Sequence, residues 1–263
     1  MLWSLQEASQ RGFAVDQQKL DQWTDWSLTQ SLAVGDDGII AGSKNLDGLE
    51  QLLLAHGDSP ISDTMAENYE AIKKIILDGQ QPDGAWKPRG QLPDQRRPAA
   101  ETMQVSTMWA ILALAYPSQT EETANAIQQA RTWLQDAKPG LSSEWLIVRL
   151  LVENRFGDPN QTKKYLEQLL QLQNEDGGWS WLTTEPSDPF ATGQALYALA
   201  ILSTKNNNRA IQRAQQFLLN SQQKDGSWLF PSTLTRKKGE TVATSIYWGT
   251  AWATIGLVRT LPD

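Results

Sequence analysis

The sequence contains no cysteine and a single histidine, and these two shortages exclude many kinds of site. Without Cys the chain has no disulfide, no Cys-ligated zinc or iron–sulfur cluster, and no thiol nucleophile. A multi-His metal site is excluded too, and a Ser-His-Asp triad would need His56, which we interpret as the end of a Leu-rich helix. We therefore expect no metal and no cofactor.

Long apolar runs and an excess of positive charge are also lacking. The longest fully apolar stretch, Met108 to Tyr116, is far shorter than the ~20 residues of a membrane-spanning helix. Residues 3–10 mix apolar and polar side chains, unlike a signal peptide, and the compartment stays open. The formal net charge of −7 argues against nucleic acid as a partner.

What the sequence does have is tryptophan, with 12 copies, and three of them end a shared motif. Gln-x-x-Asp-Gly-x-Trp occurs at residues 80–86, 173–179 and 222–228. The spacing indicates a repeat of about 46 residues, with degenerate copies near residue 130 and at residues 35–38. The motif residues are Gln80, Asp83, Gly84, Trp86, Gln173, Asp176, Gly177, Trp179, Gln222, Asp225, Gly226 and Trp228.

Each repeat is predicted to hold two helices, an amphipathic outer one and a more apolar inner one. Together with an opening helix over residues 2–10, this makes about eleven helices. The outer helices are expected to start near Asp16, Ile61, Thr120, Pro159 and Asn207, and the inner ones near Asn45, Ala99, Ser142, Phe190 and Glu240. We predict one all-α domain over residues 1–263, with two concentric layers of helices, possibly part of a larger protein.

The motif itself is predicted to be structural, a turn that joins neighbouring helix pairs. Its Gly supplies a left-handed backbone, its Asp caps N–H groups of the turn, and its Gln bridges to the next repeat. Its Trp offers a large apolar body and an N–H that needs a partner. In the degenerate copy near residue 130, Trp133, Gln135, Asp136 and the Pro139-Gly140 turn occupy the same place.

Three motifs in register, each followed by an apolar helix, resemble the QW repeat of squalene–hopene cyclases and related terpenoid cyclases. More broadly they resemble the α/α toroid, a fold shared with the β-subunits of protein prenyltransferases. The resemblance implies a ring of helix pairs around an apolar central cavity. A full ring would hold six pairs, and this sequence has five and a half.

The chemistry of these families does not follow from the fold. Class II terpenoid cyclases protonate an alkene with an Asp-x-Asp-Asp motif, and the sequence lacks it. It also lacks the Asp-Asp-x-x-Asp diphosphate motif and the Cys of a prenyltransferase zinc site. We therefore expect a non-catalytic module that binds a small amphipathic molecule, a saccharide or a partner protein.

One repeated sequence pattern favours the alternative that the protein is an enzyme. Glu-Thr-x-x-x-Ser-x-x-Trp occurs at residues 101–109 and 240–248, at the start of two inner helices, each after a basic loop. We expect these segments to meet an acidic loop at one mouth of the ring, where Glu101 and Glu240 either favour the helix dipole or act as a general acid–base pair. The candidate ligand-binding residues are Arg96, Arg97, Ser106, Trp109, Glu185, Asp188, Thr192, Lys237, Lys238, Ser245 and Trp248.

The alternatives predict different structures. An enzyme, resembling the polysaccharide lyases and hydrolases built on α/α toroids or a divergent cyclase, predicts a deep cavity and a carboxyl group whose pKa is raised by burial. A saccharide site predicts an exposed Trp face. An interaction module predicts an exposed apolar patch.

Overall fold

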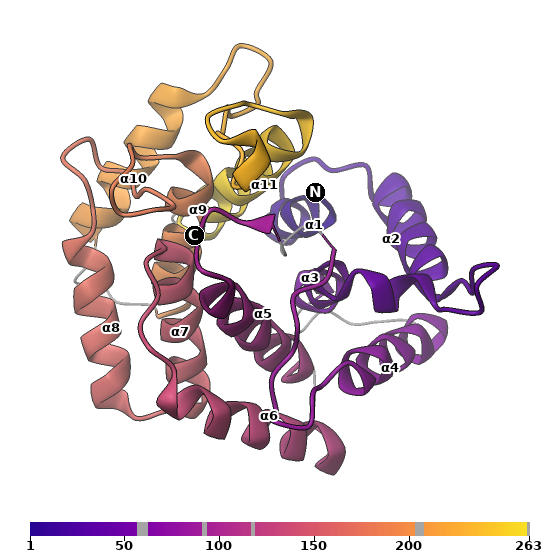
Figure 1. Ribbon diagram of the computed structural model, residues 1–263. Helices are drawn as coiled ribbons and strands as arrows, with labels where there is room; N and C mark the ends of the chain where they lie inside the picture. Colours follow the sequence, from indigo (N-terminus) through magenta and orange to yellow (C-terminus); the bar gives the residue numbers. More distant parts are fainter. Residues whose placement is uncertain (57–62, 91–93, 117–118, 203–207, 262–263) are drawn as a thin grey trace. The chain divides into compact units, whose positions relative to one another are not determined.

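The computed structural model describes residues 1–56, 63–90, 94–116, 119–202 and 208–261, and within them the regular structure is helical apart from isolated β-bridges. Eleven α-helices follow one another along the described chain (Figure 1). They are α1 (Leu2–Gln10), α2 (Gln17–Leu32), α3 (Leu46–His56), α4 (Asp63–Asp78), α5 (Ala99–Leu114), α6 (Glu121–Trp133), α7 (Ser143–Phe156), α8 (Pro159–Gln171), α9 (Pro189–Ile201), α10 (Asn208–Ser221) and α11 (Ala243–Arg259).

The number of helices and most of their starts agree with the prediction. Asp158 and Asp188 show why: each accepts a first-turn backbone N–H, at 2.9 and 2.8 Å, and a proline follows each at the first helical position of α8 and α9. The predicted starts at Ile61 and Asn207 lie outside the described residues. The start of α11 is the least accurate, since Glu240 lies three residues before its first residue, Ala243.

The chain divides into two compact units. One holds Leu2–Ser9 and Phe13–Lys138, with α1 to α6, and we call it the α1–α6 unit. The other holds Pro139–Asp263 together with Met1 and Gln10–Gly12, and we call it the α7–α11 unit. The single domain over residues 1–263 stays a prediction.

Within the α7–α11 unit the helices form two layers. The inner helices α7, α9 and α11 pack against one another in order, while α8 packs on α7 and α10 packs on α9 and α11 (Figure 1). Burial follows the layers, because almost every residue of α9 is buried, whereas Leu169 alone is fully covered in α8. Gly193 and Gly256 let α9 and α11 approach closely, since a Cβ on Gly193 would lie 2.2 Å from the backbone of Trp252.

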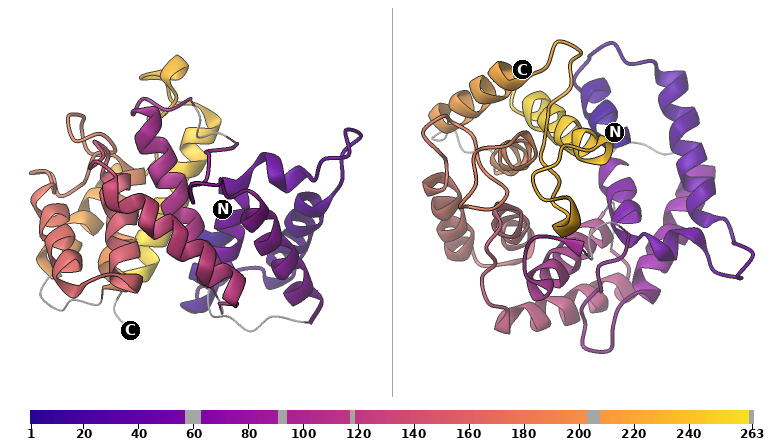
Figure 2. Two further views of the ribbon diagram at one scale, coloured as in Figure 1. Left: turned by 60° about the horizontal axis from the view of Figure 1, so that its bottom comes forward. Right: turned by 45° about the horizontal axis from the view of Figure 1, so that its top comes forward.

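The α1–α6 unit repeats this arrangement. The inner helices α3 and α5 pack together, and the outer helices α2 and α4 lie side by side in every view (Figure 2). Helix α4 also packs on α3 and α5, and α6 packs on α5. From Gln104 to Leu114 every residue of α5 is buried, which is the environment that its apolar sequence predicts.

The three intact motifs form the predicted turns, which we call Trp corners. In the corner at residues 173–179, Gly177 has a φ of 92°, and Asp176 accepts the backbone N–H of Gly178 at 3.0 Å. The Gln173 amide donates to the carbonyls of Gly177 and Ala210, both at 2.8 Å, and so joins the turn to α10. Fully buried Trp179 donates its indole N–H to the Leu169 carbonyl of α8 at 2.7 Å.

The other corners repeat this geometry in part. Trp86 and Trp228 each donate to the carbonyl ten residues earlier, at 2.7 and 2.8 Å. Gln80 bridges to Ala126 of α6, whereas Gln222 bonds only within its own turn. The degenerate copy at residues 35–38 also forms the turn, with its Gly38 at a φ of 72°.

Two sequence interpretations were wrong in part. The copy near residue 130 does not form a Trp corner, because α6 runs to Trp133 and the short 3-10 helix η3 (Leu134–Asp136) follows. Trp133 therefore stands at the motif's Gln position, and Pro139 stands at the position of its buried Trp. The apolar stretch 247–257 of α11 is also less buried than predicted, since Tyr247 is 60% exposed.

Candidate functional site

The predicted site residues of the α1–α6 unit are mostly buried at the start of α5. Glu101 lies in the first helical turn, and the buried Arg97 donates from Nε to the Thr102 hydroxyl at 3.3 Å. The Ser106 hydroxyl donates to an oxygen of Asp47 at 3.2 Å. Trp109 packs edge-on against Trp3 of α1, with ring centroids 6.4 Å apart, and Arg96 is half-buried.

The predicted residues around α9 serve the Trp corner beside them. The Asp188 carboxylate accepts the backbone N–H groups of Ala191 and Trp181, at 2.8 and 2.6 Å, and Thr192 accepts the backbone N–H of Trp179 at 2.9 Å. Burial raises the pKa of Asp188 to about 7, against the opposing effect of these hydrogen bonds, and the negative charge of the half-buried Glu185 adds to the increase.

The predicted residues before α11 lie at the surface or cap the helix. Glu240 is exposed and pairs with Lys237 at 3.0 Å, and Lys238 is exposed. Ser245 accepts the backbone N–H of Val242 at 3.1 Å, which completes a capping arrangement at the start of α11.

Trp248 stands edge-on to Phe190, with centroids 6.1 Å apart. Glu101 and Glu240 belong to different compact units, so the mouth at which they would meet stays a prediction.

Sequence reasoning missed a pair of buried carboxyl groups on α3. Asp47 and Glu50 lie one helical turn apart, and both are buried. Burial raises the pKa of Glu50 well above its ordinary value of 4.5, and the charge of Asp47 raises it further. The Oε1 atom of Glu50 has no hydrogen-bond partner among the described residues. The signal in the sequence was two acidic residues three positions apart in a Leu-rich helix.

A second buried polar group links α7 to α9. Glu144 of α7 accepts hydrogen bonds from the Trp181 indole at 3.3 Å and from the Gln194 amide at 3.4 Å. The backbone N–H of Trp181 donates in turn to Asp188. These contacts hold the loop before α9 against α7, so we interpret the cluster as structural.

A hollow with the features of a binding site lies at the degenerate copy, within the α1–α6 unit. It measures about 850 Å³, inside the range of about 300–1,000 Å³ that small-molecule sites occupy. We call it the corner pocket. Its walls are the turn before Trp86, the first turns of α5, and the end of α6 with the segment after it. The lining residues are Pro82, Asp83, Ala100, Gln104, Gln128, Gln129, Thr132, Trp133, Asp136, Ala137 and Lys138.

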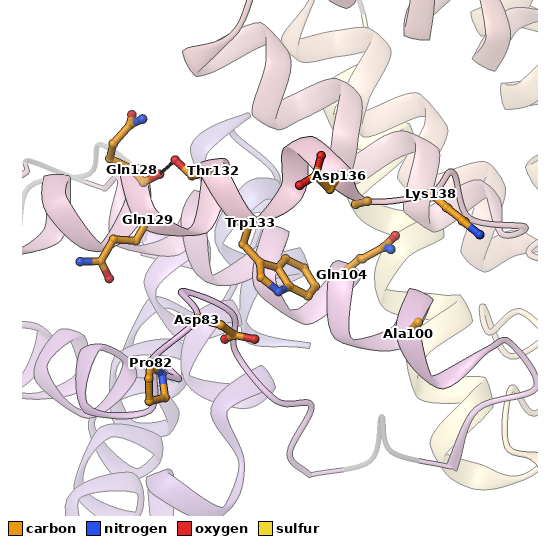
Figure 3. A pocket seen from close by; sticks show the side chains of 11 residues that line it. Pro82, Asp83, Ala100, Gln104, Gln128, Gln129, Thr132, Trp133, Asp136 and Lys138 are labelled. Atoms are coloured by element: carbon orange, nitrogen blue, oxygen red, sulfur yellow. Dashed lines mark hydrogen bonds between the residues drawn. The ribbon is translucent and has the colours of Figure 1, made fainter.

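One aromatic ring and several polar groups meet in the corner pocket. Figure 3 shows the Trp133 indole pointing into the hollow between Asp83 and Gln104. Trp133 is half-buried, in contrast to the covered indoles of the Trp corners. Asp83 is held by the backbone N–H of Ala85 at 3.1 Å. Sequence reasoning had named Trp133 and Asp136 only as parts of a repeat.

Neither a cluster of metal-ligating side chains nor a membrane-spanning helix occurs in the described residues. No group of three or more His, Asp or Glu side chains in the described ranges is arranged to hold a metal ion. No helix in that part of the chain is long and apolar enough to cross a membrane.

Comparison with known proteins supports the resemblance drawn from the motifs. Residues 118–222 match the family model of the squalene-hopene cyclase N-terminal domain. A drimenyl diphosphate synthase from Streptomyces showdoensis is 28% identical over 137 residues, which cover 46% of this chain and 26% of that enzyme. The chain therefore spans about a quarter of the length of this curated relative.

Solved structures show the same fold at low identity. A polysaccharide lyase aligns with a TM-score of 0.61 and 9% identity, over all of this chain and 91% of its own. A glycosidase aligns with a TM-score of 0.58 and 13% identity, over 98% of this chain and 85% of its own. The fold class predicted from the repeat, all-α with an α/α toroid, is confirmed, and residues 118–222 are similar to the N-terminal domain of squalene-hopene cyclases.

Proposed function

We propose that this terpenoid cyclase-like chain is a binding module that holds a small amphipathic molecule in the corner pocket without converting it. The observation that carries the proposal is the half-buried indole of Trp133 in a hollow of about 850 Å³. The intact Trp corners bury their indoles and saturate them with backbone carbonyls, so those indoles serve the fold. Trp133 is not used in that way and can serve a ligand.

The corner pocket is lined by no buried, protonated carboxylic acid, which supports binding over turnover. Burial raises the pKa of the carboxyl groups of Glu50 on α3 and Asp188 before α9, and neither of these groups lines the hollow. The carboxylates that do line it, Asp83 and Asp136, are exposed. Protonation of an alkene requires a neutral, water-shielded carboxylic acid next to the substrate, and the lining offers none.

The charge of the lining also disfavours the diphosphates that cyclases handle. Asp83 and Asp136 carry two negative charges, and Lys138 supplies one positive charge. The name of the bacterial relative states that its product is a diphosphate. A diphosphate in this pocket would meet a net negative lining, and like charges close together repel.

An enzyme is the second candidate, and Glu50 is the residue that favours it. Burial and the charge of Asp47 raise the pKa of its carboxyl group, so it keeps its proton to a higher pH than an ordinary glutamic acid does. This candidate replaces the predicted pair Glu101 and Glu240 with a residue on α3.

The test combines a turnover assay with a binding assay. The protein is incubated with farnesyl diphosphate and, separately, with polygalacturonate and a cello-oligosaccharide, and products are sought by mass spectrometry. Binding is measured with N-phenyl-1-naphthylamine, a neutral amphipathic fluorophore. We expect no product from any substrate and saturable binding of the fluorophore.

Variants connect the binding to the corner pocket. Trp133→Ala should weaken fluorophore binding at least tenfold. Trp23→Ala is the matched control, because Trp23 is a 50% exposed indole on α2 outside the pocket, and it should change nothing. Product formation that Glu50→Gln abolishes would support the enzyme and overturn the binding module. If Trp133→Ala and Trp23→Ala change fluorophore binding equally, the fluorophore does not bind in the corner pocket.

A further inference from the structure

The corner pocket lies at the one predicted repeat copy that does not form the repeat turn. At residues 80–86, 173–179 and 222–228 the Asp-Gly turn carries a Trp that is buried beneath the preceding outer helix. After α6 the chain instead enters η3, and Pro139 stands three residues after Asp136, where a Trp would complete the motif. The hollow and its half-buried indole therefore occur together at the incomplete repeat.

The groups in the lining fall into two kinds. Trp133 presents a flat, apolar and polarisable ring to the hollow (Figure 3). Around it lie the exposed amides of Gln128 and Gln129 and the buried amide of Gln104, which already has a partner within the protein. The Gln128 oxygen accepts a hydrogen bond from Arg131 at 3.3 Å, so the Gln129 amide and the Gln128 N–H groups are the amide groups that can pair with a ligand. Asp83 and Asp136 add acceptors on either side of Trp133 (Figure 3).

This combination is complementary to a sugar ring. One face of a pyranose presents C–H groups that pack on an indole, and its rim carries hydroxyl groups that both donate and accept hydrogen bonds. Amide and carboxylate side chains match neighbouring hydroxyls because they offer two adjacent polar atoms in one plane. A purely apolar ligand would cover the Gln129 amide and the Gln128 N–H groups without pairing them, which costs free energy.

We propose that the corner pocket is a saccharide-binding site and that its ligand is a neutral oligosaccharide of two or more rings. The inference rests on the proposed function and names the ligand class of the same pocket. The volume of about 850 Å³ is more than a single ring needs.

The charge of the lining selects the neutral saccharide. Asp83 and Asp136 outnumber Lys138, so a uronate would bring a further negative charge into an already negative pocket. The pocket should therefore prefer maltose or cellobiose to digalacturonate, and added salt should reduce that preference.

The test is a titration with three disaccharides: maltose, cellobiose and digalacturonate. Binding is followed by isothermal titration calorimetry and by displacement of N-phenyl-1-naphthylamine. We expect at least one neutral disaccharide to bind saturably and displace the fluorophore. We expect digalacturonate to bind at least tenfold more weakly.

Three variants locate the site. Trp133→Ala should weaken disaccharide binding at least tenfold, and Trp133→Phe should retain part of it because a flat ring remains. Gln129→Ala tests the polar rim, since Gln129 is exposed and its loss leaves the core intact; it should weaken binding several-fold. Trp23→Ala should bind like the wild type, and thermal melting confirms that each variant is folded.

The outcomes separate this inference from the proposed function. If the fluorophore binds in a Trp133-dependent way and no disaccharide binds or displaces it, the pocket does not bind saccharides. The proposed function as a binding module then still stands. Binding of digalacturonate in preference to the neutral sugars overturns the neutral ligand class. If the wild-type protein binds neither the fluorophore nor any disaccharide, both proposals are overturned.

Discussion

The bridging role of the corner glutamine gives a prediction whose magnitude follows from the hydrogen bonds. Gln173 donates two bonds of 2.8 Å, one within its turn and one to Ala210 of α10. Gln222 occupies the same motif position but makes one bond of 3.1 Å, within its own turn, at an exposed site. The two residues therefore form a natural comparison of a bridging with a non-bridging corner.

Replacing Gln173 by Ala removes both donated bonds and leaves two carbonyl oxygens without this donor. It also removes the longer bond, of 3.4 Å, that the Gln173 oxygen accepts from Arg213. A protein hydrogen bond contributes about 0.5–1.5 kcal/mol net, so Gln173→Ala should lower the free energy of unfolding by about 1–3 kcal/mol. Gln222→Ala removes one exposed bond and should cost about 0.5 kcal/mol or less.

The assay is urea denaturation followed by circular dichroism, with the m-value checked in each variant. Gln80→Ala offers a replicate in the α1–α6 unit, because Gln80 also donates two bonds, both of 2.9 Å. If Gln173→Ala and Gln222→Ala lower stability equally, the bridge between neighbouring repeats does not contribute, and the corner model is refuted.

Three further predictions concern the packing and the buried polar groups. Gly193→Ala should destabilise the protein by about 3 kcal/mol or more in thermal or urea unfolding, because its new Cβ would lie 2.2 Å from the Trp252 backbone; a neutral result would refute the close packing of α9 and α11. Thr192→Val leaves the buried N–H of Trp179 without its acceptor and should cost about 1–3 kcal/mol by urea unfolding, whereas Thr192→Ser should cost less. The raised pKa of Glu50 means that its contribution is fully present below pH 4.5 and is lost as pH rises through the folded-state pKa. Glu50→Gln should therefore flatten the decline of melting temperature from acidic toward neutral pH, and an unchanged pH profile would show that Glu50 is not buried as described.

Much of the fold was predictable because its signals are local. The Gly of each motif requires a left-handed backbone, and Gly84, Gly177 and Gly226 all have φ between 86° and 95°. The apolar sequence of α9 predicted burial on all sides, and the structure confirms it. The copy at residues 35–38 was recognisable from Asp37 and Gly38 alone, since the turn needs only these residue types.

The failures arose where a local pattern depends on distant partners. Trp133 and Asp136 suggested a fourth corner, but the chain there lacks the Gly after Asp that the turn requires. Asp47 and Glu50 look like the polar face of a helix, and their burial depends on packing that periodicity does not report. The pairing of Glu101 with Glu240 stays a prediction, because it depends on the arrangement of two compact units, which no motif encodes.

The most direct test of the binding module is an NMR titration of the tryptophan side chains. Each indole N–H gives its own signal in a ¹⁵N-labelled protein, and single Trp→Phe variants assign them. Addition of a neutral disaccharide or of N-phenyl-1-naphthylamine should shift the Trp133 signal and leave those of Trp86, Trp179 and Trp228 in place. Shifts of the corner indoles with a static Trp133 signal would contradict the account.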